Sequence, residues 1–449
     1  MEENKMATAP IKKLVLTTGI PLMISLLISN LYNFVDSIFV AHISEKALTA
    51  LSLANPIQVL MSALGMANAV GLNAAISKAL GKKDQKEVEQ TATSAIWLAF
   101  IFWLILATLS LLILKPYFLS QSNHDLEITH YGISYLRICM LASLGVMGQW
   151  VFDRFTISSG KTHLFLITLS SGAIVNIILD PIFIFGYFGL PQMGIQGAAI
   201  ATVIGQFVGA IMGIIINKKY NKEIPIHFSL IPDFKCVKNI LSVGVPSGIA
   251  QAMLSMMGIY VNSILIHFSA TAVAVNGVIV KIQSLILVPI WGLNNGLVPL
   301  VAYNYGAHQL KRSFESLKWS LIYEYGIFII LLILLELFPS KILSLFDAST
   351  HMLEIGIPAM RILGIAYLIS IVSLALASTF QGFSKGLQAM ILTLSRQVIL
   401  LFIFLTFFKS FNQINLIWFA YILAEVCCLP IGYFMYQKIK KKVIQEVEQ

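Results

Sequence analysis

Twelve apolar segments, each long enough to cross a bilayer, make up most of this chain of 449 residues. A helix needs roughly 20 apolar residues to span about 30 Å of hydrocarbon. Hydrophobic residues make up 57% of the chain and charged ones 11%, and the mean hydropathy of +0.83 excludes a soluble domain. Because a backbone inside a bilayer has no water to bond to, each span is expected to be a helix. The sequence therefore predicts an all-α integral membrane protein with spans near 14–40, 48–77, 91–114, 129–153, 163–188, 195–216, 240–266, 272–302, 316–338, 354–380, 387–408 and 414–436.

The second half of the chain resembles the first half closely enough to indicate a tandem duplication. Residues 19–86 recur 225 positions later without a gap, and a further stretch recurs at an offset of 224. We therefore expect two repeats of six spans each. Among the recurring pairs are Gly19 and Gly244, Pro21 and Pro246, Gly71 and Gly296, Lys86 and Lys311, Arg137 and Arg361, and Lys161 and Lys385.

The basic residues between the spans alternate in density and so predict the topology. One set of connecting segments holds many lysines and arginines, whereas the other set holds only Lys46, Lys115, Lys341 and Lys409. The positive-inside rule places the basic set, and with it both termini, in the cytoplasm. The net charge of +9 therefore reflects topology and does not indicate a nucleic-acid partner.

An even number of spans in each repeat gives both copies the same orientation. Two parallel six-helix repeats are then related by a pseudo-two-fold axis along the membrane normal, which is a transporter architecture. We predict an N-terminal lobe at 1–216, a cytoplasmic linker at 217–239, and a C-terminal lobe at 240–449 that ends in a basic cytoplasmic tail.

One carboxylate inside a span is present in the first copy and absent from the second. Asp36 lies within the first apolar segment and aligns with Val261 of the copy, so the scaffold does not require an acid there. A snorkelling or helix-capping acid is the alternative. An ionisable residue inside a hydrophobic span is by default functional.

The fifth and sixth spans carry further oxygen-bearing side chains. Asn176 and Asp180 are four residues apart and so share one helix face, and Pro181 follows directly. From the rise of a helix, Thr202 can lie at the same depth as Asp36 and Asp180. Two carboxylates, an amide and a hydroxyl in an apolar lobe suit either a proton or a hard cation such as Na⁺. For Asn176 and Thr202 alone, a helix–helix hydrogen bond is the simpler interpretation.

These residues lie in strings that resemble the multidrug and toxic compound extrusion (MATE) family over essentially the whole chain. The strings are NFVDSIFVAHIS around Asp36, NIILDPIFIFG with Asn176 and Asp180, GIQGAAIAT ending at Thr202, and VPLVAYNYGA in the eighth span. The sequence is similar to the bacterial branch whose cation site lies in the N-terminal lobe. The resemblance implies that these four residues couple an ion to the export of cationic, amphipathic drugs by alternating access. Another branch places acids in the C-terminal lobe, but here the seventh span has no glutamate and the tenth no aspartate.

Four further residues are candidates for a cavity or a gate. Pro21 could let the first span bend. Glu425 aligns with Thr202 and is either a cavity-facing acid of the C-terminal lobe or the partner of a buried base. Lys281 is a candidate for that base, or else a group that regulates Asp36 across the cleft. Asp153, with Arg154, forms a cytoplasmic gate or simply a solvated pair. The symmetric Arg137 and Arg361 are expected to be headgroup or structural anchors.

A flippase of lipid-linked oligosaccharides or an exporter of polysaccharides is the alternative function, because these resemble the family in fold. Their cavities are usually basic, whereas the N-terminal lobe here carries acids, which favours cationic cargo. No motif for a membrane enzyme is present, and we expect no cofactor and no metal beyond a possible Na⁺ at Asp36, Asn176, Asp180 and Thr202. We favour H⁺ as the coupling ion, because two carboxylates suffice for it whereas Na⁺ needs every ligand aimed at one point. The expected form is a monomer in the bacterial cytoplasmic (inner) membrane.

Overall fold

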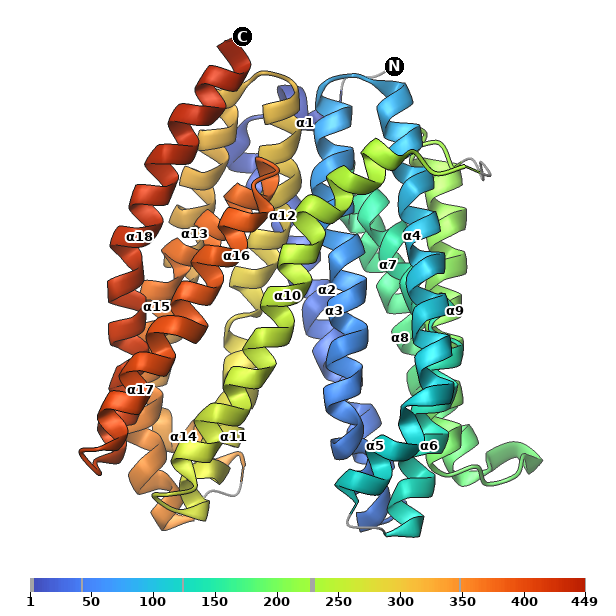
Figure 1. Ribbon diagram of the computed structural model, residues 1–449, viewed down its shortest axis with the longest axis vertical. Helices are drawn as coiled ribbons and strands as arrows, with labels where there is room; N and C mark the ends of the chain where they lie inside the picture. The colour runs from blue at the N-terminus through green and yellow to red at the C-terminus, as the bar shows by residue number, and fades with distance from the viewer. Residues whose placement is uncertain (1–3, 42, 123–124, 227–230, 347–348, 449) are drawn as a thin grey trace. The chain divides into compact units, whose positions relative to one another are not determined.

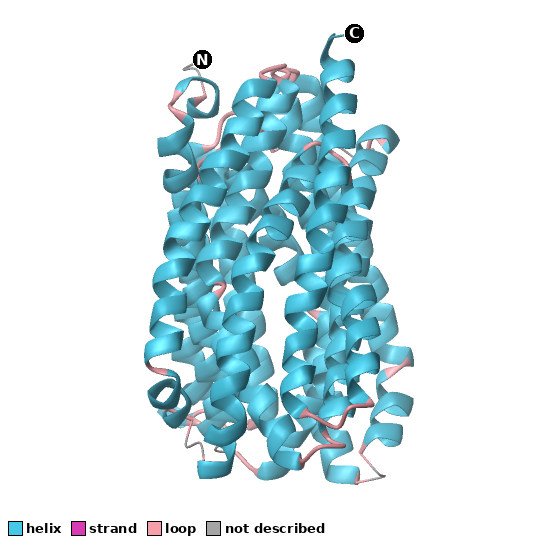
Figure 2. Ribbon diagram, turned by 90° about the vertical axis from the view of Figure 1, so that its left-hand side faces the viewer, coloured by secondary structure: helices cyan, strands magenta, loops and turns pink. Residues whose placement is uncertain are grey.

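The computed structural model describes residues 4–41, 43–122, 125–226, 231–346 and 349–448. These residues form helices joined by short loops, and no strand occurs among them (Figure 2). The helices are α1 (Lys5–Thr8), α2 (Ile11–Ala41), α3 (Glu45–Gly81), α4 (Gln85–Leu112), α5 (Leu114–Gln121), α6 (Leu126–Leu141), α7 (Leu144–Ser158), α8 (Thr162–Phe185), η1 (Tyr187–Gly189), α9 (Ile195–Tyr220), α10 (Phe234–Leu265), α11 (Ala270–Ile286), α12 (Val288–Gly306), α13 (Leu310–Leu337), α14 (Pro339–Ser344), α15 (Thr350–Gly382), α16 (Gly386–Leu394), η2 (Ser395–Leu400), α17 (Leu401–Lys409) and α18 (Ile414–Glu448).

The twelve predicted spans each correspond to helical structure of sufficient length. Within the described residues, 10 helices are long and apolar enough to cross a membrane, and two bent pairs of helices bring the total to as many as 12. The pairs are α6 with α7, bent by 46°, and α11 with α12, bent by 49°. The prediction of an all-helical membrane protein is confirmed.

The two bends do not follow the repeat. The counterpart of the α6–α7 pair is α15, and the counterpart of the α11–α12 pair is α3, and both counterparts are continuous helices. Pro289, at the start of α12, contributes to the second bend, because proline has no N–H to donate to the preceding turn. The duplicated sequence has therefore diverged into two differently shaped halves.

The backbone retains clear traces of the duplication. Ser44 caps α3 by accepting a bond from the N–H of Ala47, and its copy Ser269 caps α11 by accepting one from Ala272. Left-handed backbone conformations recur as well, in the tight turns that join the spans. Lys83 and His308 have φ values of 59° and 57°, and Gly160 and Ser384 have values of 77° and 60°. These pairs match the offsets of the sequence repeat, which supports the two-repeat prediction.

Contacts between residues divide the chain into two compact units. Unit 1 consists of Met1–Met23 and Ile249–Gln449, and unit 2 consists of Ile24–Gly248. Helices α2 and α10 each contribute to both units, and each passes from one to the other shortly after its proline, Pro21 or Pro246. The functional lobes at 1–216 and 240–449 stay a prediction.

Helix α1 and the last turns of α18 lie at the same end of unit 1 (Figure 1). Arg312, in the first turn of α13, donates hydrogen bonds to the carbonyl oxygens of Met6 and Ala9 at 3.0 and 2.8 Å. Tyr305, at the end of α12, donates to Glu446 near the end of α18 at 2.7 Å. Because α18 extends to Glu448, the basic residues of the predicted tail belong to this helix.

Acids cap two helices outside the spans. Asp125 precedes α6 and accepts bonds from the backbone N–H groups of Ile128 and Glu127. The N–H of Ile128, together with the ammonium of Lys46, holds the pKa of Asp125 below its usual range. Asp233 precedes α10 and accepts a bond from the N–H of Cys236, which lowers the pKa of Asp233 in the same way.

Candidate functional site

Helices α8 and α9 pack closely because glycines face each other at their contact. A Cβ atom on Gly205 would lie 2.7 Å from the carbonyl oxygen of Gly172 and 3.1 Å from the Cβ of Asn176. Small residues allow membrane helices to approach in this way. The glycine pair therefore places Thr202 of α9 beside the polar face of α8.

Three of the four predicted coupling residues meet at this contact. The side-chain amide of Asn176 donates to the Oδ1 of Asp180 at 3.3 Å and to the Oγ1 of Thr202 at 3.4 Å. Thr202 donates in turn to the carbonyl oxygen of Ala198 at 3.0 Å. Asp180 is fully buried and Asn176 is 3% exposed. The spacing of four residues predicted the shared face correctly, and the helix–helix bond of Asn176 and Thr202 is present.

Asp36 approaches the same cluster from α2. Its carboxylate lies close enough to Asp180 for a direct electrostatic interaction, and both residues belong to unit 2. The Oδ1 of Asp36, the Oδ2 of Asp180 and the Oδ1 of Asn176 are buried and have no hydrogen-bond partner among the described residues. Buried polar atoms normally have a partner. Three such oxygens in one cluster form a site that can take up a proton or a cation.

Two tyrosines and a cysteine, which the sequence reasoning missed, surround Asp36. Tyr32 lies one turn earlier on α2, and Tyr135 and Cys139 lie on α6, and all three interact electrostatically with Asp36. The side-chain amide of Gln58 on α3 donates to the hydroxyl of Tyr135 at 3.3 Å. Tyr32 could have been predicted from the sequence, because it lies one turn before Asp36 on the same helix. The position of Tyr135 could not, because it depends on how α6 packs against α3.

Pro21 lies in a different part of α2 from the cluster. It belongs to unit 1, where its neighbour Gly19 packs against Leu293 of α12. At 1.5 Å per residue, Pro21 is about 22 Å along the helix from Asp36. The structure therefore does not bring Pro21 to the coupling residues, and its role in bending the span stays a prediction.

Asp153, on α7, is buried within unit 2. It is 2% exposed, accepts a hydrogen bond from the hydroxyl of Thr168 on α8, and interacts electrostatically with Arg154. The alternative of a solvated pair is therefore wrong, because a solvated carboxylate would be exposed. Its Oδ2 has no hydrogen-bond partner among the described residues.

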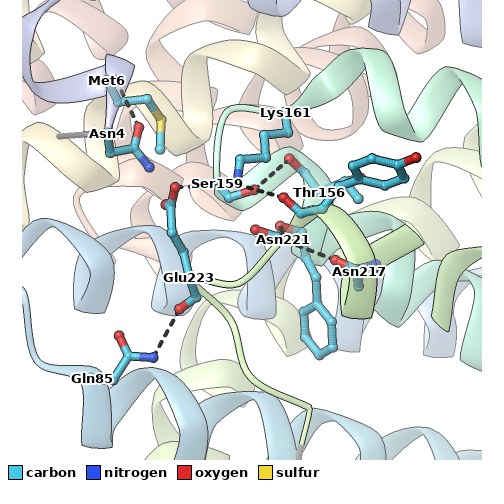
Figure 3. Close-up of polar contacts among 11 residues, drawn as sticks. Asn4, Met6, Gln85, Thr156, Ser159, Lys161, Asn217, Asn221 and Glu223 are labelled. Atoms are coloured by element: carbon cyan, nitrogen blue, oxygen red, sulfur yellow. Dashed lines mark hydrogen bonds and ion pairs between the residues drawn. The ribbon is translucent and has the colours of Figure 1, made fainter. Parts of the chain in front are cut away.

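The end of α7 next to Asp153 is held by a polar network (Figure 3). Asn217 and Asn221 of α9 donate to the carbonyl oxygens of Phe152 and Phe155 at 2.9 and 3.0 Å. Lys161 donates to the carbonyl oxygen of Tyr220 at 3.0 Å and pairs with Glu223 at 3.4 Å (Figure 3). These bonds join the ends of α7 and α9 and the start of the predicted linker.

In unit 1 the base that pairs with Glu425 is Arg396 and not Lys281. The guanidinium of Arg396 donates to the Oε1 of Glu425 at 2.7 Å, and the two residues are 3% and 7% exposed. Lys281, on α11, is exposed. Arg396 could have been identified as a candidate partner from the sequence, because it is an ionisable residue inside the predicted span 387–408.

The symmetric arginines occupy exposed positions. Arg361 pairs with Glu336 at 3.3 Å, and both side chains are partly exposed. Arg137 is also exposed. An anchoring role for both residues stays a prediction.

The close approach of α8 and α9 leads to a testable expectation. Gly205→Ala should lower the melting temperature of the purified protein and reduce export, because the added Cβ would push Thr202 away from Asn176. Overpacking of this kind costs typically about 1–3 kcal/mol. Gly326→Ala in α13 is the matched control, because a Cβ at that position meets no described atom within 4 Å. Equal melting temperatures for the two variants would contradict the proposed packing.

Comparison with known proteins shows where this fold belongs. The MatE family model matches residues 21–182 and 246–407, and the two matches begin at the offset of the sequence repeat. The probable multidrug resistance protein NorM of Thermotoga maritima is 27% identical over 387 residues, which cover 85% of this chain and 82% of that protein. The multidrug export protein MepA of Staphylococcus aureus is 24% identical over 433 residues, which cover 95% and 94%.

Solved structures agree with the sequence comparison at the level of the fold. An outward-facing multidrug resistance MATE family transporter of the MOP superfamily superimposes with a TM-score of 0.92 at 22% identity, over 99% of each chain. A MOP superfamily transporter from Pyrococcus furiosus, whose binding pocket is described as having reverse polarity, gives a TM-score of 0.90 at 22% identity over 100% and 99%. Since the family model matches both copies of the repeat and more than half of the chain, the protein belongs to the MatE family, the multidrug and toxic compound extrusion transporters.

Proposed function

We propose that this protein is a secondary active multidrug exporter that exchanges a cation for amphipathic cationic compounds by alternating access. The observation that carries the proposal is the cluster of Asp36, Asp180, Asn176 and Thr202, with three buried oxygens that have no described partner. The names of the relatives NorM and MepA support multidrug cargo. An acidic cluster in the N-terminal half favours cargo and coupling ions of positive charge.

We favour H⁺ over Na⁺ as the coupling ion. The amide nitrogen of Asn176 donates to Asp180 and Thr202, so two oxygens that a sodium ion would need as ligands already accept hydrogen bonds. A sodium ion needs several oxygen ligands directed at one point. A proton requires only one of the two carboxylates and neutralises a buried charge.

A flippase or polysaccharide exporter remains the second candidate. The Pyrococcus furiosus transporter demonstrates that a chain of this fold can carry a pocket whose reverse polarity suggests a different function. A whole-cell assay separates the two functions. Cells that produce the protein should retain less of a cationic dye than cells with an empty vector, and equal retention would count against the exporter.

The proposed setting is the bacterial cytoplasmic membrane, with both termini in the cytoplasm. A cysteine introduced at Gln192 should then react with a membrane-impermeant thiol reagent added to intact cells, whereas one at Lys222 should not. Both positions are exposed in the structure. The native Cys427 is also exposed, so the test uses a Cys427→Ser background. The reverse labelling pattern would overturn the topology.

A further inference from the structure

Unit 1 contains a cavity that the coupling cluster does not use. The cavity has a volume of about 370 Å³ and is lined by residues of α10, α11, α12, α15, α16, η2, α17 and α18. Its wall is largely apolar, with Leu254, Val261, Trp291 and Leu401 among the lining residues. A cavity of this size with an apolar wall and a few convergent polar groups is typical of a small-molecule site.

The charged groups of this cavity are Arg396 and Glu425. Both residues are buried, with 3% of Arg396 and 7% of Glu425 exposed, and both line the cavity. The guanidinium donates a 2.7 Å bond to the Oε1 of Glu425, while the Oε2 of Glu425 has no hydrogen-bond partner among the described residues. Tyr367 is close enough to interact electrostatically with Glu425. The pair therefore presents both a donor edge and an acceptor oxygen.

The backbone at Arg396 is also unusual. Residues Ser395–Leu400 form a π-helical turn between α16 and α17. Such turns are rare and are frequently found at functional sites, because they displace a side chain from its regular helical position. Here the turn carries the buried base that faces Glu425.

The other copy of the repeat shows that the scaffold does not need this ion pair. Glu425 aligns with the uncharged Thr202, and the residues that correspond to Arg396 at offsets of 224 and 225, Gly172 and Ser171, are uncharged as well. In the first copy these positions bring α8 and α9 together without any charge pair. Burying two charges costs desolvation energy that their attraction does not reliably offset, so a buried pair is weak evidence for a stabilising role.

We infer that this cavity binds an amphipathic zwitterion, with the carboxylate of the ligand on Arg396 and its cationic group beside the Oε2 of Glu425. A guanidinium binds carboxylates through paired N–H groups, and a carboxylate attracts a cationic group at close range. A ligand that is only cationic would be repelled by Arg396, and a ligand that is only anionic would be repelled by Glu425. The binding of a zwitterion does not depend on the proposed function. Only the consequence that such compounds are exported rests on it.

Two dyes that share one body test the inference. Rhodamine B carries both a carboxylate and a cationic ring system, whereas its ethyl ester is only cationic. Binding is measured by fluorescence anisotropy with purified protein in nanodiscs and without any ion gradient. The native protein should bind rhodamine B more tightly than the ester, and Arg396→Gln should weaken binding of rhodamine B by about tenfold with little effect on the ester.

Matched variants separate this role from a loss of folding. Arg361→Gln makes the same chemical change at an exposed position outside the cavity and should leave both affinities unchanged. The double variant Arg396→Gln with Glu425→Gln leaves no charge unpaired, and it should lose the preference for rhodamine B while it keeps its affinity for the ester.

Two results would overturn the inference. One is a folded double variant that binds both dyes as the native protein does, and the other is a native protein that does not distinguish the dyes. Glu354→Gln should keep the affinity for rhodamine B, because Glu354 is exposed and does not line the cavity. Selective binding without export of either dye from cells would retain the cavity and reject the exporter.

Discussion

Asp36→Asn is expected to reduce dye export to the level of cells that lack the protein. The substitution keeps the shape of the side chain but removes the group that can exchange a proton or hold a cation. Asp36 has a buried oxygen without a described partner and interacts electrostatically with Asp180. Export is measured as the loss of a fluorescent cationic dye from preloaded cells, with the amount of protein in the membrane quantified in parallel.

The same loss is expected for Asp180→Asn, and Thr202→Val should weaken export less. Thr202 supplies one hydroxyl that accepts from Asn176, so its removal leaves both carboxylates in place. Glu354→Gln is the control for an acid-to-amide change, because this residue is exposed and far from the cluster in sequence. Export at the native rate by either aspartate variant would show that the coupling site lies elsewhere.

The second large effect concerns the ion that drives transport. In proteoliposomes that contain no sodium, an imposed pH gradient is expected to drive uphill movement of a cationic dye, and collapse of the gradient by an ionophore should stop it. The physical reason is that a proton neutralises one of two neighbouring buried carboxylates, which relieves both their repulsion and the cost of burial. Asp36→Asn liposomes should show no gradient-driven movement.

A sodium gradient provides the opposing test. Export that follows sodium and ignores the pH gradient would reject H⁺ and retain the site, because Asp36, Asp180, Asn176 and Thr202 together offer oxygen ligands for a hard cation. In that case the Oδ1 of Asp180 and the hydroxyl of Thr202 would have to exchange their bonds from Asn176 for contacts with the ion. Loss of both responses in Asp180→Asn would still assign the coupling to this cluster.

Much of the site followed from regularities of a single helix. The four-residue spacing of Asn176 and Asp180 fixed their common face, and the structure places them within 3.3 Å of each other. The alignment of Asp36 with Val261 marked this acid as dispensable for folding. Counting depth along the spans brought Thr202 to the same level, because the rise of a helix is constant.

Other features depended on contacts between distant segments. Lys281 was one candidate for a buried partner of Glu425, but the partner is Arg396, from a π-helical turn that no periodicity predicted. Asp153 was open to two interpretations until the packing of α7 against α8 showed it buried against Thr168. The bends between α6 and α7 and between α11 and α12 likewise break the symmetry of the repeat.

The sequence by itself determined the helical membrane fold and the duplication, and it predicted which residues form the polar cluster around Asp180. These features depend on hydrophobic length, helical periodicity and internal similarity, and all three can be measured along one chain. Only the tertiary structure decided which charges pair, which acids are buried and where a cavity remains. Such properties depend on how side chains from different helices fill space, and a single change between the copies, such as Arg396 in place of an uncharged residue, alters them without altering the pattern of spans.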